Sequence, residues 1–568
     1  MRKLLILSAV AAVTIAAPAS AAPEPGAMRV QKVHSYASHA KRVVETYVQV
    51  YDPLPASAGA HPPACDWIGY LRFRSAKGPR KASRADAIGV FMPGYLAGGG
   101  YFDPVARNAI RDAAVRGRHI EVWGLDRRSN CLEDHRGLDA AAAAKNPAVA
   151  YGYYFGGQAI DGQTFAGFRS GDDIEFLRQI GIDQTVRDWR TVLTTGIPSA
   201  RVRRHKVICG GHSLGGPITT AFADWDFDGD PATTKDAGYR LCAGFLGFDT
   251  RFMLNPSSPV GASPQAILGL AGTAQDSPNV NTTPLTPETF ELPAIFGIGT
   301  LFTPDKTDLI QQLPQTVNIE SAIRLLFSRN AAVFAAGPTV RSFTISDAAA
   351  LGGIFDDNSA PLSFLRVSVG FFTGGAIADK NFPTQGDGTF AIPSDPSTPY
   401  GWATYDQVGD ADHPLTQNEE GGTYTDRESE AVDLRDLART QFEAPANFLE
   451  QYFPNRLTDD VRDLGNGSRD GTLANLRYDG IAKRPAMLIM AGDSSDNKVA
   501  DDGPPIVGEP PNQNPLSRRI TIPGYNHNDV LLAARRQNDG RPEPSSTALA
   551  HYLLKIAASH RHPRHRKH

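Results

Sequence analysis

The strongest constraint on the fold is an alternation between short apolar runs and amphipathic stretches. The apolar runs lie at residues 67–73, 87–94, 119–126, 205–211 and 241–249, and the stretches with helical spacing lie at 104–117, 173–193 and 215–225. Strands that are apolar throughout are buried on both faces, which is typical of a parallel sheet covered by helices. The pattern therefore predicts an α/β fold with a mostly parallel, doubly wound sheet.

The alternation stops near Leu254 and resumes only after about Gly480. In between, proline, glycine, serine and threonine separate helical patches at 321–337 and 363–378. Apolar runs at 485–493 and 518–527 and a helical stretch at 545–559 then complete the pattern. So long an interruption is more typical of a cap domain than of a structureless loop. The expected segments are a signal peptide (1–21), the first part of the core (22–254), a cap (255–480), the second part of the core (481–558) and a basic, disordered tail (559–568).

The first residues predict export. Arg2 and Lys3 precede an apolar run that ends near Ala17, and small residues then lead to Ala21. This order is typical of a secretory signal peptide cleaved near Ala21, so we expect a secreted or periplasmic protein. The run is too short for a membrane-spanning helix, and no later stretch is long and apolar enough, so we expect no transmembrane segment. The net charge of -4 gives no reason to expect nucleic acid as a partner.

The cysteine count indicates that the apolar core, more than disulfides, holds the fold together. The chain has 4 cysteines in 568 residues, which is few for an exported protein. Cys65 and Cys131 lie in polar segments and are the pair that we expect to form a disulfide. Cys209 and Cys242 lie inside apolar runs and are expected to be buried free thiols, although adjacent strands could bring them together.

A glycine-flanked serine carries the main functional signal. Residues 211–215 read Gly-His-Ser-Leu-Gly, with a predicted strand before them and a predicted helix after them. A serine nucleophile on a sharp strand-to-helix turn needs this setting, because side chains at the flanking positions would collide with the neighbouring strand and helix. Ser213 is therefore predicted to be a nucleophile, and the alternative is an ordinary turn serine.

A serine nucleophile needs a base and a carboxylate that orients the base. His527 follows the last predicted strand and is the candidate base. Asp496 is the first candidate for the acid and Asp493 the second, because both follow the run at 485–493. Asp249, at the end of the strand predicted at 241–249, is the third.

Acyl transfer also needs donors for the developing oxyanion. One donor is expected to be the backbone N–H of Leu214, the residue after the nucleophile. The glycine-rich loop at 91–103 is expected to supply the second, from the N–H of Tyr95 or Leu96. No Gly-Lys-Ser/Thr follows this loop, so it does not fit a phosphate-binding loop.

Together these features resemble the α/β-hydrolase superfamily, and the fragment GHSLGG resembles the elbow of its lipases and carboxylesterases. The resemblance covers roughly residues 60–254 and 481–557. It implies the α/β-hydrolase fold, with a large cap inserted between the sixth and seventh strands. Two departures matter: Pro93-Gly94 stands where many members carry His-Gly, and the turn after Gly492 is about one residue longer than usual.

The function expected from these residues is that of an exported serine hydrolase that cleaves carboxylic esters through an acyl-enzyme on Ser213. A small-molecule or lipid-like ester is the expected substrate, and no cofactor is required. An amidase, a peptidase or an acyltransferase could use the same triad. A binding module on a hydrolase fold is the alternative of another class, but such a protein is expected to have lost its serine or histidine.

Two further patterns stay open at the level of sequence. Asp224, Asp226 and Asp228 precede Gly229 as in the first half of a calcium loop, but Lys235 stands where an EF-hand has its glutamate. The expectation is a solvated acidic turn, with a calcium site of another kind as the alternative. Aromatic and aliphatic patches at 150–157, 290–302 and 367–375 could line a pocket for an acyl chain, or form the cap's own core, which the sequence favours.

Overall fold

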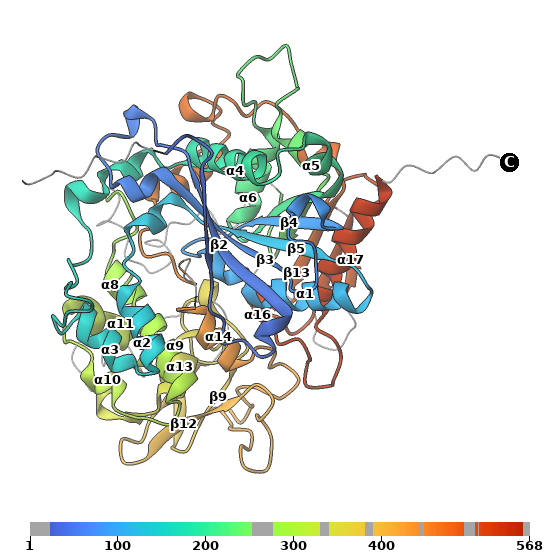
Figure 1. The fold of residues 1–568 in the computed structure, drawn as a ribbon. Helices are drawn as coiled ribbons and strands as arrows, with labels where there is room; N and C mark the ends of the chain where they lie inside the picture. The colour runs from blue at the N-terminus through green and yellow to red at the C-terminus, as the bar shows by residue number, and fades with distance from the viewer. Residues whose placement is uncertain are drawn as a thin grey trace, which may run out of the picture.

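A ten-stranded sheet crosses the centre of the molecule (Figure 1). The structure is a computed structural model, and it describes residues 23–252, 277–329, 340–380, 390–443, 445, 448–493, 506–508 and 511–560. The strand order is β1-β2-β3-β5-β4-β6-β7-β13-β15-β14. The strands are β1 (Met28–Lys32), β2 (Val43–Tyr51), β3 (Trp67–Ser75), β4 (Ala87–Met92), β5 (Ile120–Leu125), β6 (Val207–His212), β7 (Gly244–Phe248), β13 (Ala486–Ala491), β14 (Ile506–Gly508) and β15 (Arg518–Ile522).

The centre of this sheet is parallel. Strands β5, β4, β6, β7, β13 and β15 pair in parallel, whereas β1, β2, β3 and β14 add antiparallel pairs at the two edges. Every residue of β4, β5, β6, β7 and β13 is buried, as continuous apolar runs require. The predicted α/β class with a mostly parallel sheet is confirmed. Strands β1 and β2 were not foreseen, because β1 is exposed throughout and buried positions in β2 largely alternate with half-buried ones.

Helices cover both faces of the sheet (Figure 1). Helices α1 (Asp103–Val115) and α17 (Pro544–Ser559) pack together on one face, with α16 (Asp529–Leu532) beside them, and α4 (Ile182–Gly196) and α6 (Gly215–Asp224) lie on the other, near α5 (Ala200–Lys206). The helices expected near 104–117, 215–225 and 545–559 are thus present. Packing of these helices against the sheet buries the core on both sides.

The helix expected over 173–193 is confirmed only from residue 182 onward. Residues 171–179 form 3-10 turns, and α4 begins only at Ile182. Asp460, on the cap helix α15 (Asn455–Gly465), accepts the N–H of Ile182 at 2.8 Å and so caps α4. The same carboxylate lies 2.1 Å from where a Cβ on Gly181 would stand. A residue distant in sequence therefore decides where the helix starts.

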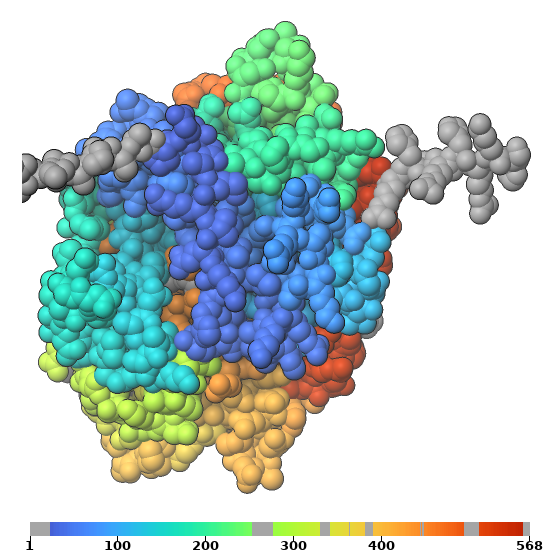
Figure 2. All heavy atoms as spheres, in the orientation of Figure 1, coloured from blue at the N-terminus to red at the C-terminus, as the bar shows by residue number. Residues whose placement is uncertain are grey.

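The chain between β7 and β13 forms a separate group of elements, whose early part makes the lower end of the surface in Figure 2. Its helices are α8 (Pro287–Phe290), α9 (Leu292–Phe302), α10 (Leu309–Gln312), α11 (Val317–Phe327), α13 (Asp347–Phe355), α14 (Leu434–Thr440) and α15. Its strands are β8 (Thr344–Ile345), β9 (Gly370–Thr373), β10 (Ile377–Lys380), β11 (Phe390–Pro393) and β12 (Pro399–Thr404), in a three-stranded and a two-stranded sheet. Helices α2 (Arg136–Ala144) and α3 (Pro147–Tyr154) pack against α9 from the first half of the chain.

The helical patch expected at 363–378 is wrong, because this stretch carries β9 and β10. Gly370 and Gly374 have φ values of 125° and 97°, which a helix does not allow. Strand β9 pairs with β12, where Trp402 lies opposite Phe372. The apolar patch at 290–302 is different: residues 292–301 of α9 are all buried, so this patch belongs to the core of the cap.

Both cysteine pairs are bonded. The expected bond between Cys65 and Cys131 is confirmed. Cys209 and Cys242 also form a disulfide, so the expectation of free thiols is wrong. Cys209 lies in β6 and Cys242 just before the adjacent strand β7, so the parallel pairing of these strands brings the two sulfurs together.

Several expectations concern residues that the structure does not describe. They are the signal peptide at 1–21, the cap boundary at 255, the candidate acid Asp496 and residues 561–568 of the tail. Within the described part of the chain, none of the helices is both long and apolar enough to cross a lipid bilayer.

Candidate active site

Ser213 lies at the turn between β6 and α6 in a backbone conformation that is rare for residues other than glycine. Its φ is 54°, in the left-handed region. Its N–H donates to the carbonyl of Phe248 in the adjacent strand at 3.1 Å, and its own carbonyl accepts the hydroxyl of Thr250 at 2.5 Å. The partly exposed serine therefore stands at the carboxyl end of the parallel strands, held by backbone contacts.

The glycines around Ser213 are required by close approach. A Cβ on Gly211 or Gly215 would lie 2.7 or 2.2 Å from the carbonyl oxygen of Met92 at the end of β4. A Cβ on Gly216 would lie 2.0 Å from the hydroxyl of Thr250. Side chains at these positions would push β6 and α6 away from the neighbouring strands, which explains the spacing of the motif.

His527 lies in the loop between β15 and α16, and its ring is oriented by Asp249. Nδ1 of His527 is 2.6 Å from Oδ2 of Asp249. A carboxylate only accepts, so Nδ1 carries the proton, and in the neutral ring Nε2 is a free base. Nε2 has no hydrogen-bond partner among the described residues. A ring in this state can take a proton from a hydroxyl group.

The carboxylate beside His527 is thus the third candidate that the sequence offered. Asp249 follows β7, has φ 36°, and accepts the N–H of Ala491 at 3.0 Å through its second oxygen. The first candidate, Asp496, lies outside the described residues. Asp493 is described, and its N–H donates to the carbonyl of Tyr525 at 3.0 Å. Because β7 is the direct neighbour of β6, its end lies close to the serine turn.

His212, the residue before Ser213, supports the loop of His527 and was not foreseen. Its Nε2 lies 3.0 Å from the carbonyl oxygen of His527, so Nε2 carries the proton and donates. The two rings lie 4.5 Å apart between centroids. Burial lowers the pKa of His212 well below its usual value, with the neighbouring His527 acting in the same direction.

Among the described residues, no hydrogen bond joins the side chains of Ser213 and His527. Hydrogen bonds between a catalytic base and its nucleophile are often long without substrate and shorten when substrate binds.

Backbone N–H groups near Ser213 are free to bind a ligand. The N–H groups of Leu214, Tyr95 and Leu96 donate to no acceptor within the described ranges. Leu214 follows the serine, and the loop of Tyr95 packs against it, since a Cβ on Gly94 would lie 3.0 Å from the Cβ of Ser213. Free donors on both sides of a hydroxyl suit a developing oxyanion.

Arg127, after β5, holds this loop from behind, and the sequence did not reveal it. Its guanidinium donates to the carbonyls of Pro93 (2.6 Å), Gly94 (2.8 Å) and Ala97 (2.9 Å). The same group pairs with Glu450 at 2.6 Å, and both side chains are 1% exposed. The Gly94–Tyr95 peptide is trans, so the N–H of Tyr95 points away from Arg127. No sequence motif marks an arginine that acts on backbone carbonyls.

The cap contributes the outer wall of the loop. The ring of Tyr95 packs against Phe453 and Phe364, with centroids 4.8 and 6.0 Å away. Asn528, next to His527, donates to the carbonyl of Phe364 at 3.0 Å. Aromatic residues of the cap therefore lie against both the candidate oxyanion loop and the histidine loop.

The acidic turn after α6 brings together a different set of aspartates from the three that the sequence suggested. Asp226, Asp228 and Asp236 each place an oxygen within 4.8 Å of the others. Asp224 instead accepts the N–H of Gly480 at 2.6 Å. Calcium binding at this turn stays a prediction from the sequence.

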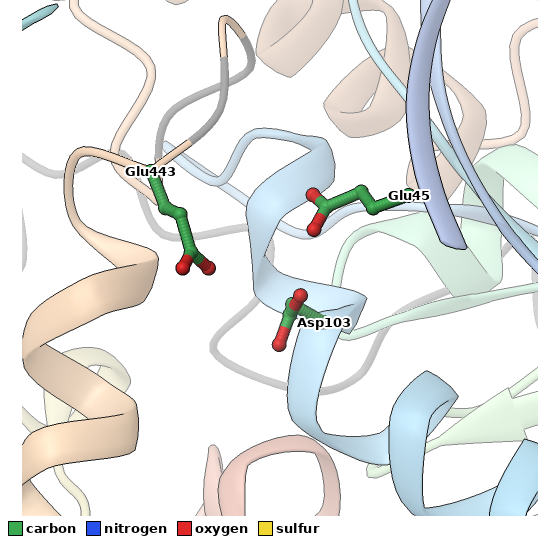
Figure 3. Close-up of side chains that lie close together, drawn as sticks. All are labelled: Glu45, Asp103 and Glu443. Carbon is green, nitrogen blue, oxygen red and sulfur yellow. The ribbon is translucent and has the colours of Figure 1, made fainter. Parts of the chain in front are cut away.

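Three carboxylates in the interior, those of Glu45, Asp103 and Glu443, face a shared space between β2, α1 and the segment after α14 (Figure 3). Arg107 bonds to Glu45 and, at 2.7 Å, to Asp103. Arg439 bonds to Asp103 and, at 2.7 Å, to Glu443. The two guanidinium groups supply the positive charge here, so this cluster is an ion-pair network that ties the cap to the sheet.

Comparison with known proteins finds similarity in structure but not in sequence. No protein-family model matches it, and no curated protein matches it. Among solved structures, juvenile hormone epoxide hydrolase from the silkworm Bombyx mori is similar over 90% of this chain and 78% of its own, with 10% identity and a TM-score of 0.31. Epoxide hydrolase A from Mycobacterium thermoresistibile (11% identity, 86% and 95% covered, TM-score 0.30) and a lipase in its open form (10%, 94% and 99%, 0.27) are similar at the same level. With TM-scores this low, the fold class rests on the sheet described above.

Proposed function

We propose that this chain is a serine hydrolase of the α/β-hydrolase superfamily that cleaves carboxylic esters. The observation that carries the proposal is the 2.6 Å hydrogen bond between His527 Nδ1 and Asp249, next to a serine held at φ 54° between a parallel strand and a helix. Strained backbone is kept where the surrounding structure maintains it for a purpose, and a free imidazole nitrogen is the base that a serine hydroxyl needs.

The proposed reaction follows from these positions. His527 Nε2 takes the hydroxyl proton while Ser213 Oγ attacks the ester carbonyl, and Asp249 stabilises the imidazolium that forms. The N–H groups of Leu214 and Tyr95 hold the oxyanion. The imidazolium then gives its proton to the leaving alcohol, and the acyl group stays on Ser213. Water attacks the acyl-enzyme in the same way and releases the acid, so no cofactor enters the reaction.

Export is part of the proposal. The two disulfides are typical of proteins that mature in an oxidising compartment, which supports a secreted or periplasmic location. The aromatic side chains of the cap beside Tyr95 support an apolar acyl group in the substrate.

The test uses p-nitrophenyl esters of increasing chain length. The wild type is expected to hydrolyse them, and Ser213→Ala is expected to lose about 10³-fold or more of kcat. Ser397→Ala, at an exposed serine of the cap, is the matched control and should keep full activity. A fluorophosphonate probe should label Ser213 in the wild type and in the control. Equal turnover by Ser213→Ala and the wild type, or labelling at another residue, would refute the proposal.

A further inference from the structure

A second acidic cluster lies within the cap, beside the loop that carries His527. Asp356, Asp357 and Glu430 each place an oxygen within 4.8 Å of the others. Asp356 and Glu430 are 0% and 1% exposed. Three carboxylates so close together, two of them fully buried, repel one another and are poorly solvated, so the site must take up either protons or a compensating cation.

Asp356 has an oxygen with nothing to bind. Its Oδ2 accepts the N–H of Asn358 at 3.1 Å, but its buried Oδ1 has no hydrogen-bond partner in the part of the chain that is described. Leaving a buried acceptor unsatisfied is costly, and more so for a charged group. Burial, reinforced by the neighbouring carboxylates, raises the pKa of Asp356 and of Glu430 well above the usual range.

Among the described residues, no salt bridge to this cluster is formed. In the cluster of Glu45, Asp103 and Glu443, two arginines bond directly to the carboxylates. Within the described ranges, no lysine or arginine forms an ion pair with Asp356, Asp357 or Glu430. Arg366 acts on the two aspartates through its charge, but its Nε donates to the carbonyl of Ala360 at 3.0 Å.

We propose that Asp356, Asp357 and Glu430 bind a calcium ion. The ligands are carboxylate oxygens without histidine or cysteine, which selects a hard cation. Calcium accepts six to eight oxygens in irregular geometry and can lose most of its water, whereas magnesium keeps several waters and demands an octahedron. A buried cluster with an unused carboxylate oxygen suits the larger ion.

The ion would join the cap to the histidine loop. Oδ2 of Asp357 accepts the side-chain amide of Asn526, the residue before His527, at 2.6 Å. Ser368 in the cap donates to Asp529, on the other side of His527, at 2.7 Å. An effect of calcium on catalysis rests on the proposed function, whereas calcium binding does not. The binding proposal can therefore be tested, and can fail, independently of the proposed hydrolase activity.

Terbium luminescence locates the ion. Terbium replaces calcium and emits when a nearby tryptophan transfers energy to it. Trp402 donates to the carbonyl of Val369 at 3.2 Å, and the next residue, Gly370, donates its N–H to Glu430 at 2.6 Å. Trp225 lies instead beside the cluster of Asp226. In the calcium-free full-length protein, Trp402→Phe should remove the emission and Trp225→Phe should keep it. The reverse result places the ion at the other cluster and overturns the proposal.

Calcium titration calorimetry tests the ligands themselves. One site is expected in the wild type, and Asp356→Asn should weaken its affinity by about 100-fold or more, because a charged ligand is lost. Asp228→Asn, in the other acidic cluster, is the matched control and should bind as the wild type does. If Asp356→Asn does not fold, Glu430→Gln serves in its place. No binding by the wild type, or binding that Asp228→Asn abolishes, would mean that protons neutralise the cap cluster and that the proposal is wrong.

Discussion

Backbone strain gathers at the candidate site. Non-glycine residues with positive φ among those described are His39, Leu96, Lys145, Asp161, Ser213 and Asp249. Leu96 belongs to the candidate oxyanion loop, Ser213 to the serine turn, and Asp249 to the turn of the candidate acid. Such conformations cost about 1–3 kcal/mol each and persist only where neighbouring contacts hold them. Their meeting at one rim of the sheet is independent of any motif, and it favours a functional role for the same three turns.

At this scale, the choice of acid can be tested directly. Asp249→Asn is expected to lower kcat for p-nitrophenyl esters on the order of 10³- to 10⁴-fold, because an amide facing Nδ1 of His527 favours the tautomer that cannot accept the serine proton. Asp493→Asn and Asp496→Asn are the comparisons and should lose far less. A large loss in Asp496→Asn with little change in Asp249→Asn would instead assign the acid to the sequence's first candidate.

The loop after β4 is held between the core and the cap. Arg127 binds its carbonyls on one side. On the other side, the N–H of Glu450 donates to the carbonyl of Leu96, and the N–H of Gly98 donates to that of Phe448, both at 2.9 Å. These bonds occupy the carbonyls and leave the N–H groups of Tyr95 and Leu96 for a ligand. An oxyanion site must be rigid before the substrate arrives, and this element has the contacts for that.

Arg127→Lys should loosen this loop without removing its charge. We expect kcat to fall about 100-fold, as when one oxyanion donor is lost, with a smaller change in KM. Arg128→Lys is the matched control, because Arg128 is equally buried but bonds to Asp188 rather than to the loop. Steady-state kinetics on one ester separates kcat from KM. Equal kcat values in the two variants would show that Arg127 has no positioning role.

Across the whole molecule, buried carboxyl groups make stability depend on pH. Burial raises the pKa of Asp126 and of Glu291 to about 8 and that of Asp224 to about 7. At a pH between a carboxyl group's pKa in the unfolded chain and its higher pKa in the folded protein, the folded protein holds a proton that the unfolded chain has released. Stability from each group is therefore complete at low pH and is lost as pH rises through this window, by at most about 1.4 kcal/mol per pH unit and group.

Glu291→Gln tests this dependence. Glu291 is buried in the cap, and its Oε1 has no hydrogen-bond partner within the described residues. The variant should gain stability relative to the wild type as pH rises from about 5 to about 8, because glutamine has no proton to lose. Urea unfolding at several pH values measures the difference. Glu175→Gln, at an exposed carboxylate, should run parallel to the wild type, and a parallel curve for Glu291→Gln would contradict the prediction.

Local patterns were sufficient for the buried parallel strands of the central sheet and for the serine turn. Continuous apolar runs marked the buried parallel strands, since burial on both faces allows little else. Gly211 and Gly215 marked the serine turn, because a side chain at either position would collide with the end of the neighbouring strand β4. Local patterns failed at 363–378 and at Gly181, where pairing with β12 and the carboxylate of Asp460 override them.

The sequence by itself determined the α/β class, the serine turn and the histidine that follows the last parallel strand, because each depends on periodicity or on nearby sterics. Only the tertiary structure decided that Asp249 bonds to His527, that Arg127 holds the loop after β4, that Cys209 meets Cys242 and that the cap gathers Asp356, Asp357 and Glu430. These contacts join side chains that are far apart along the chain, and no local pattern encodes which of several equivalent carboxylates, arginines or thiols the folded sheet brings together.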